Sequence, residues 1–245
     1  MDGVALCARF SIATNRLQFC GPADAEPTLY SAITQEAGLD RARAALTRFE
    51  ALYPYLEAIG GKHGLDPFDP RVVEAYWIGN RLLDTFDRAD FLRILEALVR
   101  RGLPRSTADR LRAHLPAEPL PHHAFHVTFV GVGEVTGHVE TTLANMEACR
   151  PSIVRVREVR RDSLSVERSP LTVTGGRLSH GPSEIGVQPF DRRILPRVEP
   201  GDAVVVHWKH AALVLDSAQV RALERYTDRS IDAANEALPG LRALG

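Results

Sequence analysis

Apolar residues recur at helical spacing through the first half of the chain. Between Ala44 and Ile59 they recur at roughly helical spacing, which predicts a helix from about residue 40 to the Gly60-Gly61 pair. Asp69-Pro70 combines a preferred N-cap residue with a proline in the first turn, so a second helix is expected there. Two further helices are predicted over about 88–101 and after Pro104. The first half therefore has the pattern of a helical domain.

Two segments of this half depart from the helical pattern. The stretch from Cys7 to Pro27 is rich in small and turn-forming residues and is expected to be an irregular, ordered arm. Pro116, Pro119 and Pro121 follow the last predicted helix, and three prolines in six residues stiffen the backbone and remove hydrogen-bond donors. This proline-rich stretch is the best linker in the chain, so we place a domain boundary there, with domains over 1–118 and 119–245.

Beyond the prolines the hydrophobic period changes. Residues 125–130 alternate as Phe-His-Val-Thr-Phe-Val, which predicts a strand, and residues 138–149 are compatible with a short helix. A final amphipathic helix is expected to begin at Asp216. Short apolar runs separated by Gly and Pro turns predict further strands at 153–159, 164–166, 171–173, 185–187 and 203–206.

Together these patterns predict an α+β protein: an N-terminal helical domain followed by a small OB-like β-barrel with a C-terminal helix. Several short strands with Gly and Pro turns, closed by one amphipathic helix, are typical of such a barrel.

Composition narrows the function classes. With 30 basic and 31 acidic residues the chain has a formal net charge of -1, so no global positive field attracts nucleic acid. No apolar run reaches the roughly 18 residues that a membrane helix needs. The three cysteines, Cys7, Cys20 and Cys149, are widely spaced and odd in number, which fits a reducing compartment and predicts a cytoplasmic protein.

The densest polar cluster is the string Pro-His-His-Ala-Phe-His at 121–126. On a strand His122 and His126 would share one face and His123 the other, and two neutral imidazoles on one face are suited to a transition metal. The alternative is a pair of loop histidines with a third at a domain interface. No H-E-x-x-H or H-x-E motif accompanies the cluster, so a zinc hydrolase lacks its general base.

Cys149 and His207 are the other candidates for metal ligands. A thiolate binds soft or low-valent metals, and Arg150 beside it would lower the thiol pKa if the geometry allowed. His207 ends the buried strand at 203–206 and precedes Trp208. Each has a structural alternative: Cys149 as a small buried residue at a helix end, and His207 as a polar residue at the barrel rim.

From Met146 onward the chain resembles the hydrogenase assembly chaperones of the HypC/HupF type. The resemblance rests on Gly201-Asp202-Ala203-Val204-Val205-Val206-His207, which is similar to that family's string before its final helix, and on Cys149-Arg150-Pro151, which is similar to its opening cysteine. It covers about 90 of the 245 residues. In this chain the cysteine is internal, and Trp208 replaces the family's usual glycine. The whole chain also looks like an uncharacterised bacterial family loosely associated with hydrogenase gene neighbourhoods.

The resemblance implies a role in metallocentre assembly. In the chaperones, the cysteine and the histidine help to hold an iron fragment that carries cyanide and carbon monoxide and to pass it to the hydrogenase large subunit. By resemblance those roles fall on Cys149 and His207. The implied cofactor is iron or another transition metal, and the implied partner is the hydrogenase large subunit or another maturation factor.

We therefore expect an accessory or chaperone protein for a nickel-iron hydrogenase or a similar metallocentre. Its expected metal ligands are Cys149, His207, His122 and His126, and its expected partner contacts are His123, Arg150 and Trp208. No catalytic residue is predicted, and the sequence favours a non-catalytic role without settling it. Two alternatives remain open: a metal-dependent enzyme that uses the histidine cluster with a carboxylate such as Glu74 or Asp84, and a protein-protein adaptor.

Overall fold

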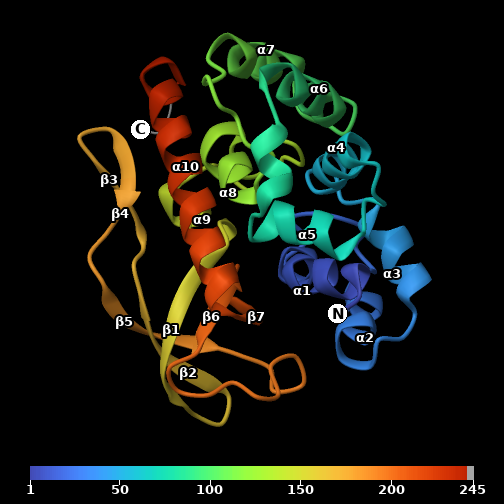
Figure 1. The fold of residues 1–245 in the computed structure, drawn as a ribbon, viewed down its shortest axis with the longest axis vertical. Coiled ribbons are helices and arrows are strands. Elements are labelled where there is room, and N and C mark those ends of the chain that lie inside the picture. Colours follow the sequence, from blue (N-terminus) through green and yellow to red (C-terminus); the bar gives the residue numbers. More distant parts are fainter. Residues whose placement is uncertain (242–245) are drawn as a thin grey trace.

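The computed structural model describes residues 1–241. It has the expected α+β architecture, in which helices form the N-terminal part and an antiparallel sheet with a long final helix follows them (Figure 1). The helices before the sheet are α1 (Gly3–Arg16), α2 (Glu26–Gln35), α3 (Leu39–Leu46), α4 (Tyr53–His63), α5 (Pro70–Trp77), the 3-10 turn η1 (Arg81–Thr85), α6 (Arg88–Val99), α7 (Arg105–Ala113), α8 (His123–Phe125), the π-helical turn η2 (His126–Val130) and α9 (Leu143–Cys149).

Local capping explains several of these helices. The Asp69 side chain accepts a hydrogen bond from the Arg71 N–H, so the predicted start of α5 is confirmed. Asp87 and Asp90 form a reciprocal capping box at the start of α6, which confirms the predicted third helix. The long single helix predicted over about 40–60 is wrong, because a turn between α3 and α4 divides it.

The segment predicted as an irregular arm is also different. Residues 3–16 form helix α1, whose first N–H groups are capped by the Asp2 carboxylate at 2.8 and 3.2 Å. Nearly every residue of α1 is buried, and at Gly3 the absence of a side chain lets the Phe68 carbonyl approach closely. Because α1 has no broad polar face, the amphipathic period that signals a surface helix is missing from its sequence.

The sheet has the strand order β5-β2-β1-β6-β7, and all of its neighbouring strands are antiparallel. Strands β6, β1, β2 and β5 lie in the spatial order of a Greek key. The edge strands β5 and β7 approach each other, and the Gln188 side chain donates to the Lys209 carbonyl at 2.7 Å, so the sheet curls into a partly open five-stranded barrel. The strands are β1 (Ser152–Val159), β2 (Ser163–Arg168), β3 (Leu171–Thr174), β4 (Arg177–His180), β5 (Glu184–Pro189), β6 (Ala203–His207) and β7 (His210–Leu215).

Helix α10 (Ser217–Leu241) runs between the sheet and the helical part (Figure 1). Asp216 accepts from the N–H groups of Ala218 and Gln219, which confirms the predicted helix start. The Asn235 amide pairs with both backbone groups of Leu178, so α10 also holds the separate β3–β4 hairpin. One continuous hydrophobic cluster includes residues of the helices and of the barrel. The division into domains over 1–118 and 119–245 stays a prediction.

The strand predicted at 125–130 is wrong. These residues form the end of α8 and the turn η2, in which the Gly131 N–H donates to the His126 carbonyl. All six residues are buried, so the apolar and the polar side chains both face the interior. The alternation of apolar and polar residues therefore does not indicate a strand with one solvent-exposed face. Among the helices within residues 1–241, none has the length and apolar character needed to cross a membrane.

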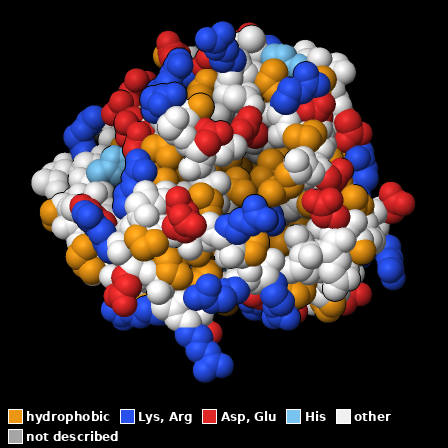
Figure 2. Space-filling model, turned by 60° about the horizontal axis from the view of Figure 1, so that its bottom comes forward, with side chains coloured by type: hydrophobic (Ala, Val, Ile, Leu, Met, Phe, Trp, Pro, Cys, Tyr) orange, Lys and Arg blue, Asp and Glu red, His pale blue; other side chains and the backbone are white. Residues whose placement is uncertain are grey.

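The surface at the lower end of the molecule carries mixed charges. Figure 2 shows apolar side chains gathered in a hollow near the centre of this face, with Lys, Arg, Asp and Glu side chains interspersed around it. No single sign of charge dominates the face, which agrees with the near-zero net charge of -1.

Candidate metal centre

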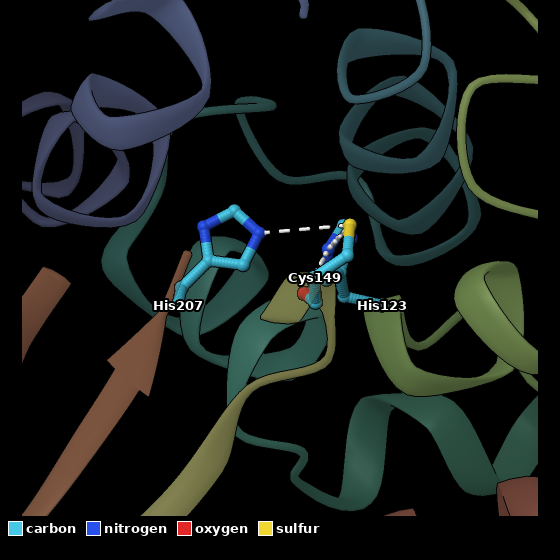
Figure 3. A group of neighbouring side chains, drawn as sticks. All are labelled: His123, Cys149 and His207. Atoms are coloured by element: carbon cyan, nitrogen blue, oxygen red, sulfur yellow. Dashed lines mark hydrogen bonds between the residues drawn. The ribbon is translucent and has the colours of Figure 1, made fainter. Parts of the chain in front are cut away.

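Cys149, His123 and His207 meet in the interior (Figure 3). The Cys149 Sγ atom lies 3.6 Å from His123 Nε2 and 3.8 Å from His207 Nε2. The candidate ligand atoms of all three residues lie within 4.8 Å of one another, and all three side chains are buried. Two of the residues, Cys149 and His207, are metal ligands predicted from the sequence, and the structure brings them together.

Strand register explains how Cys149 and His207 meet. Strand β1 is antiparallel to β6, and Ser152 is opposite Val206. The residues just before β1 therefore lie beside the end of β6, and the Trp208 N–H donates to the Ala148 carbonyl at 2.6 Å. Cys149 ends helix α9 and His207 ends β6, so both side chains are held at the ends of regular elements.

His123 reaches the same point from the short helix α8. The His122 side chain caps this helix by accepting from the Ala124 N–H at 3.3 Å, and the first helical residue, His123, is directed toward Cys149. The Trp77 ring packs against both imidazoles, with its centroid 4.3 Å from that of His123 and 5.0 Å from that of His207. Trp77 thereby limits the rotation of both rings.

The spacing of the three side chains matches ligands of one metal ion. With metal–sulfur bonds of about 2.3 Å and metal–nitrogen bonds of about 2.05 Å, sulfur and nitrogen are separated by about 3.6 Å at a tetrahedral angle and about 3.8 Å at a trigonal one. The observed separations of 3.6 and 3.8 Å agree with these two values. The two sulfur–nitrogen separations therefore suit ligands of one metal ion.

The hydrogen bond on the far side of His207 orients that imidazole for metal binding. His207 Nδ1 lies 2.8 Å from the Phe10 carbonyl, which can only accept, so Nδ1 carries the proton. The Nε2 lone pair then faces Cys149, and such an outer hydrogen bond is the usual partner of a metal-binding histidine.

His123 is held by two hydrogen bonds. Its Nδ1 lies 2.8 Å from the Tyr76 hydroxyl, and its Nε2 lies 3.1 Å from the Cys149 carbonyl. In this arrangement Nε2 donates to the carbonyl and the hydroxyl donates to Nδ1. Because a tyrosine hydroxyl can also accept, the proton can reside on Nδ1 instead, and Nε2 is then free to bind a metal.

Burial keeps this group uncharged when no metal is bound. It lowers the pKa of His207 to about 3 and holds the pKa of His123 well below its ordinary value of 6.5. It also raises the pKa of Cys149 to about 12. The site therefore has one neutral thiol and two neutral imidazoles at pH 7, and a bound metal would displace the thiol proton.

A cavity of about 60 Å³ adjoins the three side chains. A cavity holds one water when its volume is roughly 10–15 Å³, so this space suits a metal together with small additional ligands. Aromatic and aliphatic side chains form much of its wall, including Phe49, Leu52, Trp77 and Val135.

His122 and His126 lie outside the group of three. His122 caps α8, and His126 Nδ1 lies 3.0 Å from the Tyr55 hydroxyl, although its side chain also lines the cavity. The alternative of a histidine paired with Glu74 or Asp84 is not formed. Glu74 accepts from Gln219 and Asn80, whereas Asp84 accepts from Tyr226 and Arg229.

Arg150 does not lower the pKa of the neighbouring thiol. Its side chain bonds to the Glu147 carboxylate at 2.8 Å and to the Ser169 carbonyl at 2.9 Å, and it is almost fully buried. Its predicted contact with a partner stays a prediction.

Trp208 is half-buried at the tip of the β6–β7 hairpin and lines the cavity. Its φ is +50° and that of Lys209 is +56°, a left-handed conformation that bulky residues rarely adopt. Its indole N–H makes no standard hydrogen bond within the described residues. It lies near the Cys149 sulfur, and this interaction lowers the pKa of the thiol, whereas burial, the larger effect, raises it. Trp208 thus faces the candidate centre, and its predicted contact with a partner stays a prediction.

The sequence pattern pointed away from His123 as a ligand, because a strand would have turned it away from His122 and His126. The sequence of 123–130 is also compatible with a helix, because a short buried apolar run can form either a strand or a helix. The segment also contains a π-helical turn, a feature that often occurs at functional sites.

Residues 1–240 match a family of unknown function, DUF6390, and the chain belongs to that family. No curated protein and no solved structure matches the chain.

Proposed function

We propose that this member of the DUF6390 family is a metal-binding accessory protein for the assembly of a nickel-iron hydrogenase or a similar metallocentre. It holds its metal cargo through Cys149, His207 and His123. The cargo is iron or another transition metal, and the protein acts in the cytoplasm. Its partner is the hydrogenase large subunit or another maturation factor, as the resemblance of the C-terminal part implies.

The observation that carries this proposal is the meeting of Cys149 with His207 and His123 at metal-ligand separations of 3.6 and 3.8 Å. Cys149 and His207 are the residues that the resemblance selects, and they are 58 positions apart in the chain. Their approach is the geometry that a shared cargo requires. His123 adds a third donor from a different part of the sequence.

The chemistry of the site also supports a carrier. A thiolate and imidazoles suit iron with strong-field ligands, and the three side chains that supply them are buried beside a mainly apolar cavity wall. The adjoining space of about 60 Å³ accommodates small ligands on a metal and is far smaller than the roughly 300–1,000 Å³ typical of sites for organic substrates. The proposal therefore assigns no catalytic residue.

The test is the metal content of protein purified without oxygen, with infrared spectra in the cyanide and carbonyl stretching region. The parent should contain about one iron per chain with those bands. Cys149→Ser, His207→Gln and His123→Gln should lose the metal. Cys7→Ser is the matched control, because Cys7 is a second buried cysteine whose sulfur contacts Ser11 at 3.9 Å and does not face the cavity.

Retention of the metal in both Cys149→Ser and His207→Gln would contradict the proposal. The partner is tested separately by copurification with a hydrogenase large subunit that lacks its metals. Complex formation that is equal with mature and metal-free subunit would remove the assembly role, even if metal binding stands.

A further inference from the structure

The cavity beside Cys149 has uncharged walls. Among the described residues that line it, none is an aspartate, glutamate, lysine or arginine. The only lining groups that readily bind a metal are sulfur and imidazole nitrogen, and those of Cys149, His123 and His207 converge on one point. The charge of the loaded site is therefore set by the cargo and by these three ligands.

Ligand chemistry fixes the protein's share of that charge. A metal-bound cysteine is a thiolate with a charge of minus one, and a metal-bound histidine is a neutral imidazole. The three ligands together contribute a single negative charge. A net charge on three buried ligands beside a mainly apolar wall is unfavourable, because burial weakens its solvation and no charged side chain among the described lining residues compensates it.

One carboxylate that contacts the cavity wall from behind is already engaged in hydrogen bonds. Glu50 accepts from the Cys20 thiol at 3.4 Å and from the Gly21 N–H at 2.9 Å. It sits behind the cavity wall and does not line the cavity. We therefore treat Glu50 as the one side chain whose contribution to charge balance has to be measured.

We infer that this site selects a cargo with a net charge of plus one, so that the loaded centre is neutral. The inference rests on the proposed function and specifies the class of its cargo. Two kinds of cargo share this charge: a monovalent soft cation alone, and a divalent metal that carries one small monoanion. The volume of about 60 Å³ has room for the second kind.

Loading can be written as a balanced step. The S–H bond of Cys149 breaks, a metal–sulfur bond forms, and the proton passes to the buffer. His123 and His207 contribute lone pairs and release no proton to solvent. With a divalent metal, the monoanion comes from solution with the metal, and no oxidant or reductant is required.

Silver(I) and cadmium(II) provide a matched pair of probes. Both are soft, redox-stable ions with filled d shells, and they differ by one unit of charge. Trp77 and Trp208 are the only two tryptophans of the chain, and both line the cavity, so their fluorescence reports binding. Only the signal that disappears in Cys149→Ser is counted, because Cys7 and Cys20 are free thiols and can also bind these ions.

Both titrations are made in nitrate salts, and azide is added only to cadmium(II), because silver(I) precipitates with azide. Silver(I) should bind one per chain without any added anion. Cadmium(II) should bind poorly alone, and its affinity should rise by about tenfold for each tenfold increase in azide, which is the slope for one linked anion. Glu50→Gln should leave both results unchanged.

Three results would overturn the inference. Cadmium(II) that binds tightly without azide and releases only the one thiol proton shows that the site tolerates a net positive charge, because hydroxide formed from a bound water would release a second proton. Cadmium(II) binding that depends on Glu50 shows that the protein itself supplies the compensating charge. If neither ion gives a signal that depends on Cys149, the proposed function fails together with the inference. In the first two results a signal that depends on Cys149 remains, so the proposed function stands and only the inference fails.

Discussion

The sulfur of Cys149 and Nε2 of His207 lie 3.8 Å apart although 58 positions separate the two residues in the chain. The antiparallel pairing of β1 with β6 creates this contact, because it sets the start of one strand against the end of the other. The Phe10 carbonyl accepts a hydrogen bond from His207 Nδ1, so Nε2 is unprotonated and its lone pair faces the sulfur. Three segments that are distant in the sequence thus determine the position of these two side chains.

Removing the Tyr76 hydroxyl should weaken metal binding. In Tyr76→Phe, His123 Nδ1 loses its partner at 2.8 Å, and the loss of such an outer hydrogen bond typically costs roughly 10- to 100-fold in metal affinity. Competition with a chromophoric chelator measures this change. Tyr55→Phe is the control, because it breaks the equivalent buried bond to His126, which lies outside the three ligands. Both variants should lose about 1–3 kcal/mol of stability, and equal affinities would contradict the assigned role of Tyr76.

Trp208→Phe should alter the metal–thiolate bond while leaving the fold intact. The indole N–H near Cys149 becomes a charge-assisted donor once the thiol is ionised, so its removal should weaken cobalt(II) binding by roughly three- to tenfold. The sulfur-to-cobalt absorption band should shift as well. Tyr55→Phe, which removes a buried hydrogen bond to His126 outside the three ligands, should leave this band unchanged. A band that is unchanged in Trp208→Phe would show that this N–H does not reach the thiolate.

Stability should fall in mild acid. Burial lowers the pKa of His122 and His207 to about 3 and that of His126 to about 4, from an ordinary 6.5. A depressed folded-state pKa gives stability that is present above pH 6.5 and is lost as the pH falls toward the folded value, because only the unfolded chain takes up the protons. Each such histidine should cost on the order of 2–3 kcal/mol at pH 4 relative to pH 7.

Urea unfolding at pH 7, 6, 5 and 4 measures this loss. His207→Gln should be less stable than the parent at pH 7 and should show a shallower decline toward pH 4. A midpoint that does not change between pH 7 and pH 4 in the parent would mean that these imidazoles are not buried in neutral form.

Residues 119–245 should not fold as an independent unit. Phe91 packs against Phe125 of α8, and the His207 imidazole bonds to the Phe10 carbonyl, so that fragment would expose apolar surface and lose a buried hydrogen bond. Circular dichroism should show no cooperative thermal transition for 119–245 alone. A sharp transition at the temperature of the full chain would establish the predicted boundary between residues 118 and 119 as a true domain division.

Local sequence signals were sufficient for elements with one buried face. The Asp69-Pro70 start of α5, the Asp216 cap of α10 and the strand β6 after Gly201 each carry a short-range signal: a cap, a turn or an apolar run after turn residues. They failed for α1 and for residues 123–130, which are buried on nearly all sides. In such segments the polar face that reveals the period is missing.

By itself, the sequence determined the α+β class, the helical first half and the choice of Cys149 and His207 as candidates, because residue type and turn chemistry act over a few positions. Only the tertiary structure placed His123 beside them, left His122 and His126 outside this group of three, and put Trp208 at the wall of the adjoining cavity. The direction of a side chain depends on whether its backbone is helix or strand. The distance between two segments depends on strand register and on packing between elements, which are set by contacts far apart in the chain.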